Sequence, residues 1–229
     1  MDGLLLFNKP ILWTSHDAVD FVRHKVGQKA VGHAGTLDPL ATGLLIILLG
    51  KWTKRSEEFL TMGKSYEGTM LLGIETDSHD MDGKILAQKD VKGVDSEKIS
   101  SVFSALTGKI LQTPPIFSAL KQNGKKLYEM ARQGAVVTPT PREVEVKEFH
   151  LNYFHENEAA FSLSCSKGTY VRSLAHELGK RLSCGAVLSS LVRTSIGAFH
   201  LKNALTQAEL KTMTQNQIEK YLHENLLRV

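Results

Sequence analysis

The sequence predicts an α+β fold in which strands and helices are mixed along the chain. Strand-like segments such as AAFSLSCS alternate apolar and polar residues, so that Phe161, Leu163 and Cys165 share one face. Helix-like segments such as SEKISSVFSALTG carry apolar residues at helical spacing. The 229 residues, 42% of them hydrophobic, are enough to bury a core for one large domain or two small lobes.

The N-terminal third predicts strands around one helix. An apolar run ends at Asn8-Lys9-Pro10, which predicts a strand that leads into a turn. A helix follows in HDAVDFVRHKVG, with Ser15 expected as its N-cap and Gly27 as its stop. LLIILLG fits a buried strand or a helix, SEEFLTM a short helix, and SYEGTMLLG a strand.

The rest of the chain continues this mixture. TDSHDMDG predicts a hairpin or loop, SEKISSVFSALTG an amphipathic helix, and VEVKEFHLNYF a strand. Residues 113–134 begin with two prolines and carry basic and aromatic residues, so we expect a loop and a short helix that project from the body. Val171, Leu174 and Leu178 share a helical face, and Thr206 with Glu209 forms a capping box.

Composition narrows the class of protein. The longest apolar run is far shorter than the roughly 18 to 20 residues of a membrane span, and the N-terminus lacks the pattern of a secretory signal, so we expect a cytoplasmic protein. Cys165 and Cys184 fit neither a disulfide framework nor a metal site, and we expect both to be buried. The net charge of +4 favours polyanionic partners only weakly.

Several common chemistries lack their sequence marks. GKS at 63–65 has Glu58 where a phosphate-binding loop requires glycine, and the run from Ser78 has Lys89 where a calcium loop requires glutamate. The histidines form no HExxH or HxxxH pair, and no GxGxxG follows a strand. We therefore expect no metal site, and hydride transfer and ATP chemistry lack their usual sequence marks.

Asp38 stands alone among three glycines and a proline in GHAGTLDPLATG, residues 32–43. Glycines let a ligand approach the backbone closely, and Pro39 restricts Asp38 to an extended conformation. A carboxylate presented in this way suits a nucleophile or a proton acceptor. It equally suits the cap of a helix that begins at Pro39, so the loop alone leaves both interpretations open.

Together with this loop, three further segments resemble the bacterial TruB family, the tRNA pseudouridine-55 synthases. They are KSY at 64–66, GTYVRSLAHELG at 168–179 and the basic, aromatic segment around Lys121. FNKP, TDSHDMDG and LVRTSIG match in the same order along most of the chain. The family commonly has glycine two residues after the KP pair, where this chain has Leu12, so we expect the local turn to differ.

The resemblance implies a pseudouridine synthase fold: a mixed, largely antiparallel central sheet flanked by helices, with an RNA-binding cleft and a projecting thumb-like loop. It implies a single catalytic domain over residues 1–229, with 113–134 as the RNA-contacting projection. Fewer than thirty residues follow Lys202, so we expect no C-terminal RNA-binding PUA domain. The implied partner is the T-stem-loop of tRNA, without metal, cofactor or membrane. Nothing in the sequence indicates an obligate interface, so we expect a monomer.

The family isomerises a uridine in the T-loop of tRNA, at position 55, by breaking the bond to N1 and rejoining the base through C5. The resemblance makes Asp38 the essential group, with Arg172 paired to it so that the carboxylate stays ionised. It places Tyr66 under the target base. From the residues alone, Tyr66 equally suits the core of a strand, and Arg172 an exposed helix start.

The resemblance also gives four substrate-binding residues: His33, Lys64, Tyr170 and Leu191. His33 would lie near the displaced base, whereas Tyr170 and Leu191 would line the pocket. Surface exposure for His33 and packing for Tyr170 and Leu191 explain the same residues without a ligand. The lysines of 113–134 suit phosphate contacts or an ordinary solvated helix.

Two other functions stay open at this point. One is a non-catalytic module that binds or folds tRNA on the same scaffold. The other is a pseudouridine synthase that acts on ribosomal or another RNA.

Overall fold

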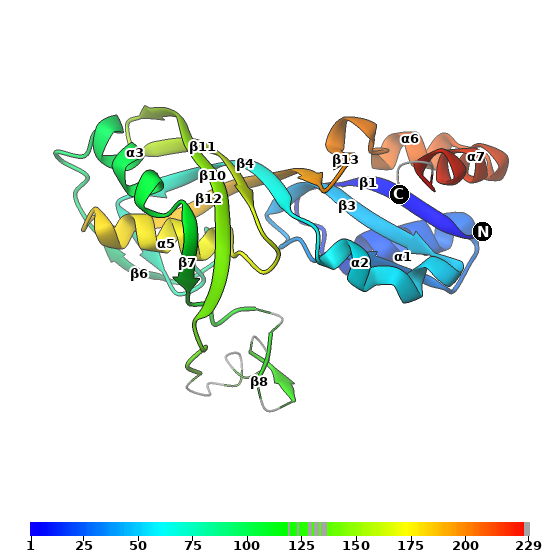
Figure 1. Ribbon diagram of the computed structural model, residues 1–229, viewed down its shortest axis with the longest axis horizontal. Helices are drawn as coiled ribbons and strands as arrows, with labels where there is room; N and C mark the ends of the chain where they lie inside the picture. The colour runs from blue at the N-terminus through cyan, green and yellow to red at the C-terminus, as the bar shows by residue number, and fades with distance from the viewer. Residues whose placement is uncertain (119, 123, 128–129, 131–132, 134–136, 227–229) are drawn as a thin grey trace. The chain divides into compact units, whose positions relative to one another are not determined.

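The structure is a computed structural model that describes residues 1–118, 120–122, 124–127, 130, 133 and 137–226. Its internal contacts divide the chain into two compact units (Figure 1). Unit 1 comprises residues 1–67 and 191–229, and unit 2 comprises residues 68–190. The single catalytic domain over 1–229 without a PUA domain stays a prediction.

Unit 1 is built around one long strand, β3. Its elements are β1 (Gly3–Lys9), α1 (Ser15–Val26), β2 (Val31–Ala34), β3 (Ala41–Leu49), η1 (Gly50–Arg55), α2 (Ser56–Leu60), β13 (Phe199–His200), η2 (Leu201–Asn203), α6 (Gln207–Thr212) and α7 (Gln215–Leu226), with parts of β4 (Lys64–Leu72) and β12 (Ala186–Ile196). Strands β1 and β2 pair antiparallel with β3, whereas β12 pairs parallel with its first three residues. The sheet of this unit is therefore mixed, as predicted.

The apolar run of β1 buries side chains on both faces of the sheet. Leu5 and Phe7 pack with α1, whereas Leu4 and Leu6 pack with Phe59 of α2. Full burial of each such side chain contributes roughly 1.5–3 kcal/mol. LLIILLG continues this pattern in β3, so the strand is confirmed and the helix alternative is wrong.

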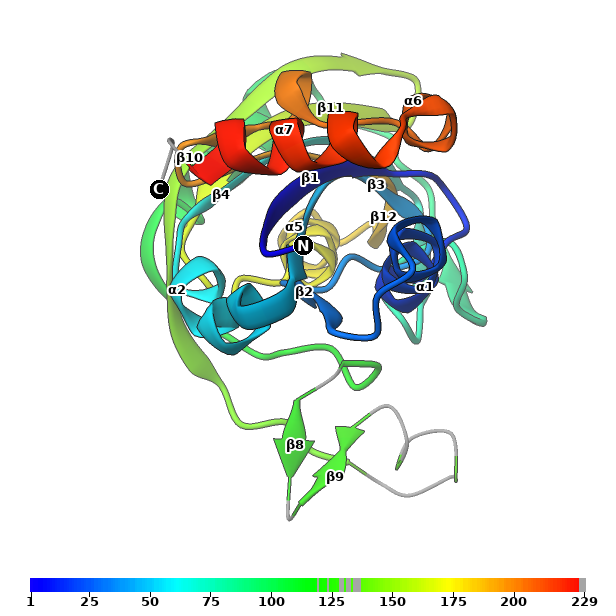
Figure 2. The same cartoon turned by 90° about the vertical axis from the view of Figure 1, so that its right-hand side faces the viewer.

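Strand β1 is an edge strand whose outer backbone groups are covered. The N–H of Leu205 donates to the carbonyl of Leu6 at 2.9 Å. From α7, the Tyr221 hydroxyl donates to the same carbonyl, and the Asn225 amide donates to the carbonyl of Leu4. Figure 2 shows α7 running alongside β1. These bonds remove a free strand edge that otherwise pairs with other chains.

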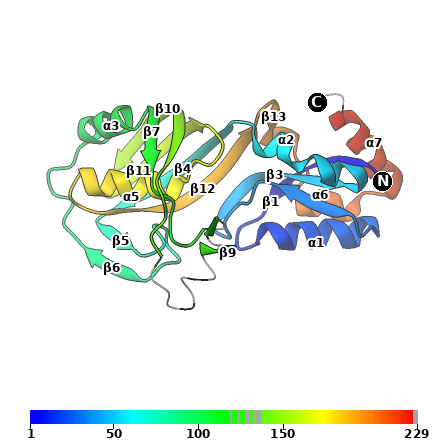
Figure 3. The same ribbon diagram turned by 60° about the horizontal axis from the view of Figure 1, so that its bottom comes forward.

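Unit 2 contains a second group of strands with two longer helices. Its elements are β5 (Ile74–Thr76), β6 (Ile85–Gln88), α3 (Ser96–Ala105), β7 (Gly108–Gln112), β8 (Lys121–Gln122), β9 (Lys125–Lys126), β10 (Arg142–His155), β11 (Glu158–Cys165) and α5 (Val171–Arg181). Its strand order is β12–β4–β11–β10–β7, and β10 pairs antiparallel with both of its neighbours. Figure 3 shows β5 and β6 as a separate two-stranded ribbon.

The core of unit 2 confirms the alternation read from the sequence. Phe161, Leu163 and Cys165 are all buried on one face of β11. Phe103 of α3 stacks on Phe149 of β10 with ring centroids 3.7 Å apart, and Phe149 meets Phe161 edge-on. Both cysteines are buried and free, as predicted.

The predicted projection, 113–134, lies only partly within the described residues. Its described part includes β8 and β9, which form a short hairpin with Lys121 opposite Lys126. Residues 119, 123, 128–129, 131–132 and 134 of this segment lie outside the described residues. Its role in RNA contact stays a prediction.

The structure bears on two local predictions, the N-cap of α1 and the turn at Leu12. The N-cap of α1 is Thr14, not Ser15, and Thr14 forms a capping box with Asp17. The TxxD pattern was therefore the correct signal for this helix start. The expected difference in the turn at Leu12 stays a prediction: this residue has a φ of 66°, the left-handed region that glycine adopts most easily. No helix in the described part of the chain is long and apolar enough to span a bilayer.

Candidate active site

Asp38 lies half-buried in the loop that joins β2 to β3 in unit 1. Residues 39 and 40 form a turn, and β3 begins at Ala41, whose N–H donates to the carbonyl of Asp38. Because a strand and not a helix follows Pro39, the helix-cap interpretation of Asp38 is wrong. The loop presents a partly accessible carboxylate at the start of a buried strand.

Ser15 fixes the backbone just before Asp38. Its hydroxyl donates to the carbonyl of Leu37 at 3.1 Å and accepts the N–H of Leu37 at 2.8 Å. Ser15 and Leu37 are both buried, so water does not compete for this pair of bonds. The residue predicted to cap α1 therefore holds the Asp38 loop in place.

Lys9 is a fully buried cation beside the same loop. Its ammonium donates to the carbonyls of Pro10, Trp13 and Pro39. Burial lowers the pKa of Lys9 to about 8, and the negative charge of Asp38 opposes this shift. Lys9 therefore places a positive charge within electrostatic range of Asp38, and it also bonds to the carbonyl of Pro39, the residue after Asp38.

Arg193 of β12 is a second fully buried cation in unit 1. Its guanidinium donates to the carbonyls of Leu44 at 2.7 Å, Gly35 at 3.0 Å and Thr36 at 3.4 Å. It also hydrogen-bonds Tyr66, and although burial lowers the pKa of Arg193, the tyrosine acts against that shift. One side chain therefore connects the Asp38 loop, strand β3 and Tyr66.

Gly43 explains the last glycine of GHAGTLDPLATG. It has a φ of 99°, and a Cβ at this position would lie 2.5 Å from the carbonyl oxygen of Arg193 and 2.7 Å from its nitrogen. Only glycine allows β3 and β12 to approach this closely. This glycine therefore sets the spacing of the strands that carry Arg193 and follow Asp38.

Four of the other predicted site residues belong to unit 1. Tyr66 is buried in β4, and His33 lies in β2 opposite Ile47. Burial and the charge of Arg193 lower the pKa of His33, so this imidazole is neutral at pH 7. Leu191 of β12 pairs with Ala41, three residues after Asp38.

Lys64 is also in unit 1, and its ammonium bonds to backbone carbonyls a few residues before it in the chain. It donates to the carbonyls of Leu60 and Met62 at 2.8 and 2.6 Å, and the side chain is buried. Tyr66 and His33 are brought into the Arg193 neighbourhood, whereas these bonds tie Lys64 to the end of α2. Its role in substrate binding stays a prediction.

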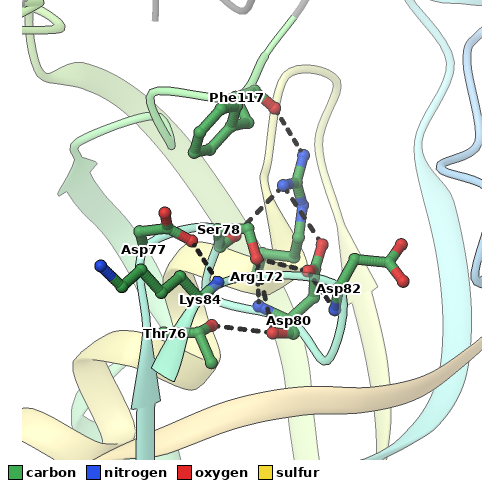
Figure 4. A network of polar contacts seen from close by, with 8 residues as sticks. All are labelled: Thr76, Asp77, Ser78, Asp80, Asp82, Lys84, Phe117 and Arg172. Atoms are coloured by element: carbon green, nitrogen blue, oxygen red, sulfur yellow. Dashed lines mark hydrogen bonds and ion pairs between the residues drawn. The ribbon is translucent and has the colours of Figure 1, made fainter. Parts of the chain in front are cut away.

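Arg172 and Tyr170 belong to unit 2, at the start of α5. Arg172 is buried; its Nη1 lies 3.3 Å from Asp80 Oδ2 and donates to the carbonyl of Ser78, and its Nη2 donates to the carbonyl of Phe117 (Figure 4). The interpretation of Arg172 as an exposed helix start is therefore wrong. Its pairing with Asp38 stays a prediction.

The residues around Arg172 form a bonded network. Asp80 accepts hydrogen bonds from the Ser78 hydroxyl at 2.5 Å and from the Asp82 N–H at 3.1 Å (Figure 4). A buried charge pair is tolerated only when its remaining donors and acceptors are satisfied. The loop between β5 and β6 thus fixes the guanidinium of Arg172.

Tyr170 is held by its backbone. Its N–H donates to Gln112 Oε1 at 2.7 Å, and its carbonyl accepts from Gln112 Nε2 at 3.1 Å. Gln112 is itself buried at the end of β7. This two-bond clamp fixes the first turn of α5, on which Arg172 stands.

His79 stacks on His176 beside this network. Their rings are 4.1 Å apart and nearly parallel, and His79 Nδ1 is buried without a hydrogen-bond partner. Burial, then the charges of His176 and Arg172, lower the pKa of His79 to about 4. The His79 ring is therefore neutral at pH 7.

Sequence reasoning missed Lys9, Ser15, Arg193 and Asp80 as parts of the site. Lys9 and Arg193 lie in FNKP and LVRTSIG, two of the segments that carry the family resemblance. The available signal was a positively charged residue within or next to an apolar strand. Such a charge is buried only where hydrogen-bond acceptors replace its water, which suggests a structured site.

Among the described residues, no group of three His, Cys, Asp or Glu side chains is arranged to hold a metal ion.

Family models match the chain in two parts. A model described as "TruB family pseudouridylate synthase (N terminal domain)" matches residues 23–171, and one described as "tRNA pseudouridylate synthase B C-terminal domain" matches residues 172–229. Curated relatives named "tRNA pseudouridine synthase B" include one from Protochlamydia amoebophila, 46% identical over all of this chain and 84% of that protein. Another, from Opitutus terrae, is 45% identical over 97% of this chain and 92% of that protein.

Solved structures share the fold. "Crystal Structure of a Cbf5-Nop10-Gar1 Complex" matches with a TM-score of 0.73 at 27% identity, over 97% of this chain and 58% of that chain. "Structure of H/ACA RNP bound to a substrate RNA containing 2'-deoxyuridine" matches with a TM-score of 0.67 at 26% identity. That match covers 90% of this chain and 51% of the other, so the chain spans little more than half of these longer proteins.

Proposed function

Because the chain belongs to the TruB family of pseudouridylate synthases, we infer that it isomerises uridine in tRNA to pseudouridine. It is therefore an enzyme, an isomerase that modifies tRNA. The reaction breaks the bond between the ribose and N1 and forms one to C5, while C5 loses a proton and N1 gains one. Atoms and electrons balance within the nucleotide itself.

Asp38 is the catalytic group of this proposal. The observation that carries it is the electrostatic setting of the Asp38 loop, in which buried Lys9 acts on the carboxylate and buried Arg193 bonds the preceding backbone. A buried cation within electrostatic range favours an ionised carboxylate over a neutral acid. An ionised carboxylate suits attack on the nucleotide or acceptance of a proton.

Tyr66 and Arg172 complete the proposed catalytic set. Arg193 holds the Tyr66 hydroxyl, which fixes the ring for stacking against a base. Arg172 is held by Asp80 and by two carbonyls, and the proposal pairs it with Asp38 in the working enzyme. His33, Lys64, Tyr170 and Leu191 remain the proposed substrate-binding residues.

The proposed target is the uridine at position 55 in the T-loop of tRNA. A base inside a folded loop must leave the stack before a carboxylate can reach it, which costs a few kcal/mol that stacking and pocket contacts recover. The proposal gives the lysines of 113–134 the role of phosphate contacts. It describes a monomeric, cytoplasmic enzyme that binds the T-stem-loop without metal or cofactor.

The second candidate function is that of a pseudouridine synthase that acts on an RNA other than tRNA. The related H/ACA particle is described as bound to a substrate RNA, which supports RNA as the partner but not tRNA in particular. Incubating the protein with an unmodified tRNA transcript and, separately, with ribosomal RNA fragments, and then mapping pseudouridine at each nucleotide, separates the two. Pseudouridine confined to position 55 of the tRNA supports the proposal, and modification of the ribosomal fragments alone refutes it.

A further inference from the structure

The turn between β1 and α1 displays two large apolar side chains. Ile11 is 57% exposed and Leu12 is 72% exposed, in a unit where other large apolar side chains are mostly buried. Leu12 also has a φ of 66°. A leucine in the left-handed region is a steric outlier, and such conformations persist where the surroundings enforce them, often at functional sites.

Hydrogen bonds connect this turn to the residue that follows Asp38. The N–H of Leu12 donates to the carbonyl of Pro39 at 2.8 Å. Lys9 binds the carbonyls on both sides, those of Pro10 and Trp13, and reaches Pro39 as well. The exposed pair is therefore fastened to the residue that follows the proposed catalytic carboxylate.

Aromatic packing fixes the far end of the turn. The Trp13 ring lies 6.3 Å from the Phe7 ring and 5.5 Å from the Phe21 ring, measured between centroids. The Trp13 side chain therefore packs on the core, whereas the side chains of Ile11 and Leu12 are exposed. These contacts hold Trp13 in place at the end of the turn.

We propose that Ile11 and Leu12 form an apolar contact for a nucleobase of the RNA substrate, next to the uridine that enters the site. This inference rests on the proposed function, because that function brings a nucleotide to Asp38. Withdrawing a base from a stack exposes the face of its neighbour, and apolar side chains cover such faces in other nucleic-acid complexes. Leu12 would then be a substrate-binding residue of this chain.

The test uses Leu12→Gly, a variant that relieves the left-handed strain and removes the apolar side chain. We expect an unchanged or higher melting temperature together with a KM for T-stem-loop RNA raised roughly 5- to 50-fold, as for the loss of a base-stacking contact. We expect kcat within about twofold, because the catalytic groups are untouched. Leu12→Met, which keeps an apolar side chain, should retain most of the affinity.

Salt dependence separates an apolar contact from a charge contact. The dissociation constant of Leu12→Gly should exceed that of the wild type by the same factor at every salt concentration, since no phosphate contact is lost. Lys125→Ala, in the basic segment, should instead lower the slope of log K against log salt by about 1. Glu156→Gly controls for strain, because Glu156 also has positive φ, at 52°, in the β10–β11 turn.

The outcomes are distinct. If the wild type forms pseudouridine and Leu12→Gly binds and turns over RNA with unchanged KM, the inference is overturned and the proposed function stands. If Glu156→Gly raises KM as much as Leu12→Gly, the effect is not specific and the inference is again overturned. If the wild type forms no pseudouridine on any RNA, the proposed function itself fails.

Discussion

At the scale of single residues, buried charge dominates the candidate site. Lys9 and Arg193 are fully buried, yet each is bonded to several backbone carbonyls, which replace the water that a cation loses. The guanidinium of Arg172 is likewise bonded, by the carboxylate of Asp80 and the carbonyls of Ser78 and Phe117. Fixed cations need no rearrangement when a negative charge develops or is consumed near them.

Asp80→Asn tests how Arg172 is held. Removing one partner of a buried ion pair is expected to lower the free energy of unfolding by about 3 kcal/mol, because the guanidinium loses its compensating charge. We also expect kcat to fall while KM for RNA changes little. Urea denaturation and steady-state kinetics measure both.

Asp77→Asn is the matched control in the same loop. Asp77 accepts a hydrogen bond from the N–H of Lys84 and does not belong to the buried pair. Its effect on stability should stay below about 1 kcal/mol. Equal losses of kcat in both variants would show that the loop, and not the Asp80–Arg172 pair, matters.

His79 predicts a pH dependence of stability. Its pKa is about 4 in the folded protein and near 6.5 in the unfolded chain, so the unfolded state binds more protons between these values. The stability that comes from the neutral ring is complete above pH 6.5 and is lost as the pH falls toward 4. The loss amounts to at most about 3 kcal/mol.

Unfolding free energies of the wild type and His79→Asn between pH 7 and 4 check this prediction. Asparagine tolerates the positive φ of this position, so the comparison isolates the ring. The wild type should lose more stability on acidification than the variant. Removing the exposed His150 instead should leave the wild-type profile unchanged, and parallel profiles for wild type and His79→Asn would refute the assignment.

At the scale of elements, the approach of β12 to β3 determines where the site forms. Gly43→Ala is expected to lower the free energy of unfolding by about 2–4 kcal/mol more than Gly93→Ala. Both glycines have positive φ, at 99° and 81°, but only Gly43 has the backbone of Arg193 against its Cα, whereas Gly93 has open space. Denaturant unfolding of the two variants measures the difference, and equal losses would contradict the close-packing argument.

The sequence predicted elements with strong local signals. Alternation predicted β11, the capping box of Thr206 and Glu209 predicted the start of α6, and Gly27 correctly marked the end of α1. These signals depend on neighbours within a few residues. The family resemblance supplied the remaining site residues, which no periodic pattern marks.

Contacts between distant segments could not be read from the sequence. Ser15 was predicted to cap α1, but it bonds Leu37, 22 residues away. Arg193 bonds Gly35, 158 residues away, and Asp80 holds Arg172 from another segment of unit 2. Local propensity carries no information on such pairs, because their energy comes from tertiary packing and desolvation.

At the scale of the whole molecule, the proposed catalytic set draws on both units. Asp38 and Tyr66 belong to unit 1, and Arg172 belongs to unit 2. The proposal therefore requires an electrostatic effect of Arg172 on the reaction. If Arg172 pairs with Asp38 as proposed, the acidic limb of the kcat/KM profile of Arg172→Gln should move to higher pH by about 1–3 units, because that variant lacks the cation that would favour the ionised carboxylate.

Arg181→Gln is the control for this pH profile. Arg181 stands on the same helix, α5, but pairs with Glu177 at the surface. Its acidic limb should coincide with that of the wild type. If the acidic limb of the kcat/KM profile of Arg172→Gln stays at the wild-type pH, Arg172 has no electrostatic effect on the reaction.

The most direct measurement compares pseudouridine formation by the wild type, Asp38→Asn and Asp20→Asn on an unmodified T-stem-loop RNA, with the dissociation constant of each. Asp20 is a partly exposed carboxylate of α1 that pairs with Arg23. We predict that Asp38→Asn binds RNA within about threefold of the wild type but forms product at least about a thousandfold more slowly, whereas Asp20→Asn is unaffected. Turnover by Asp38→Asn at the wild-type rate would contradict the account.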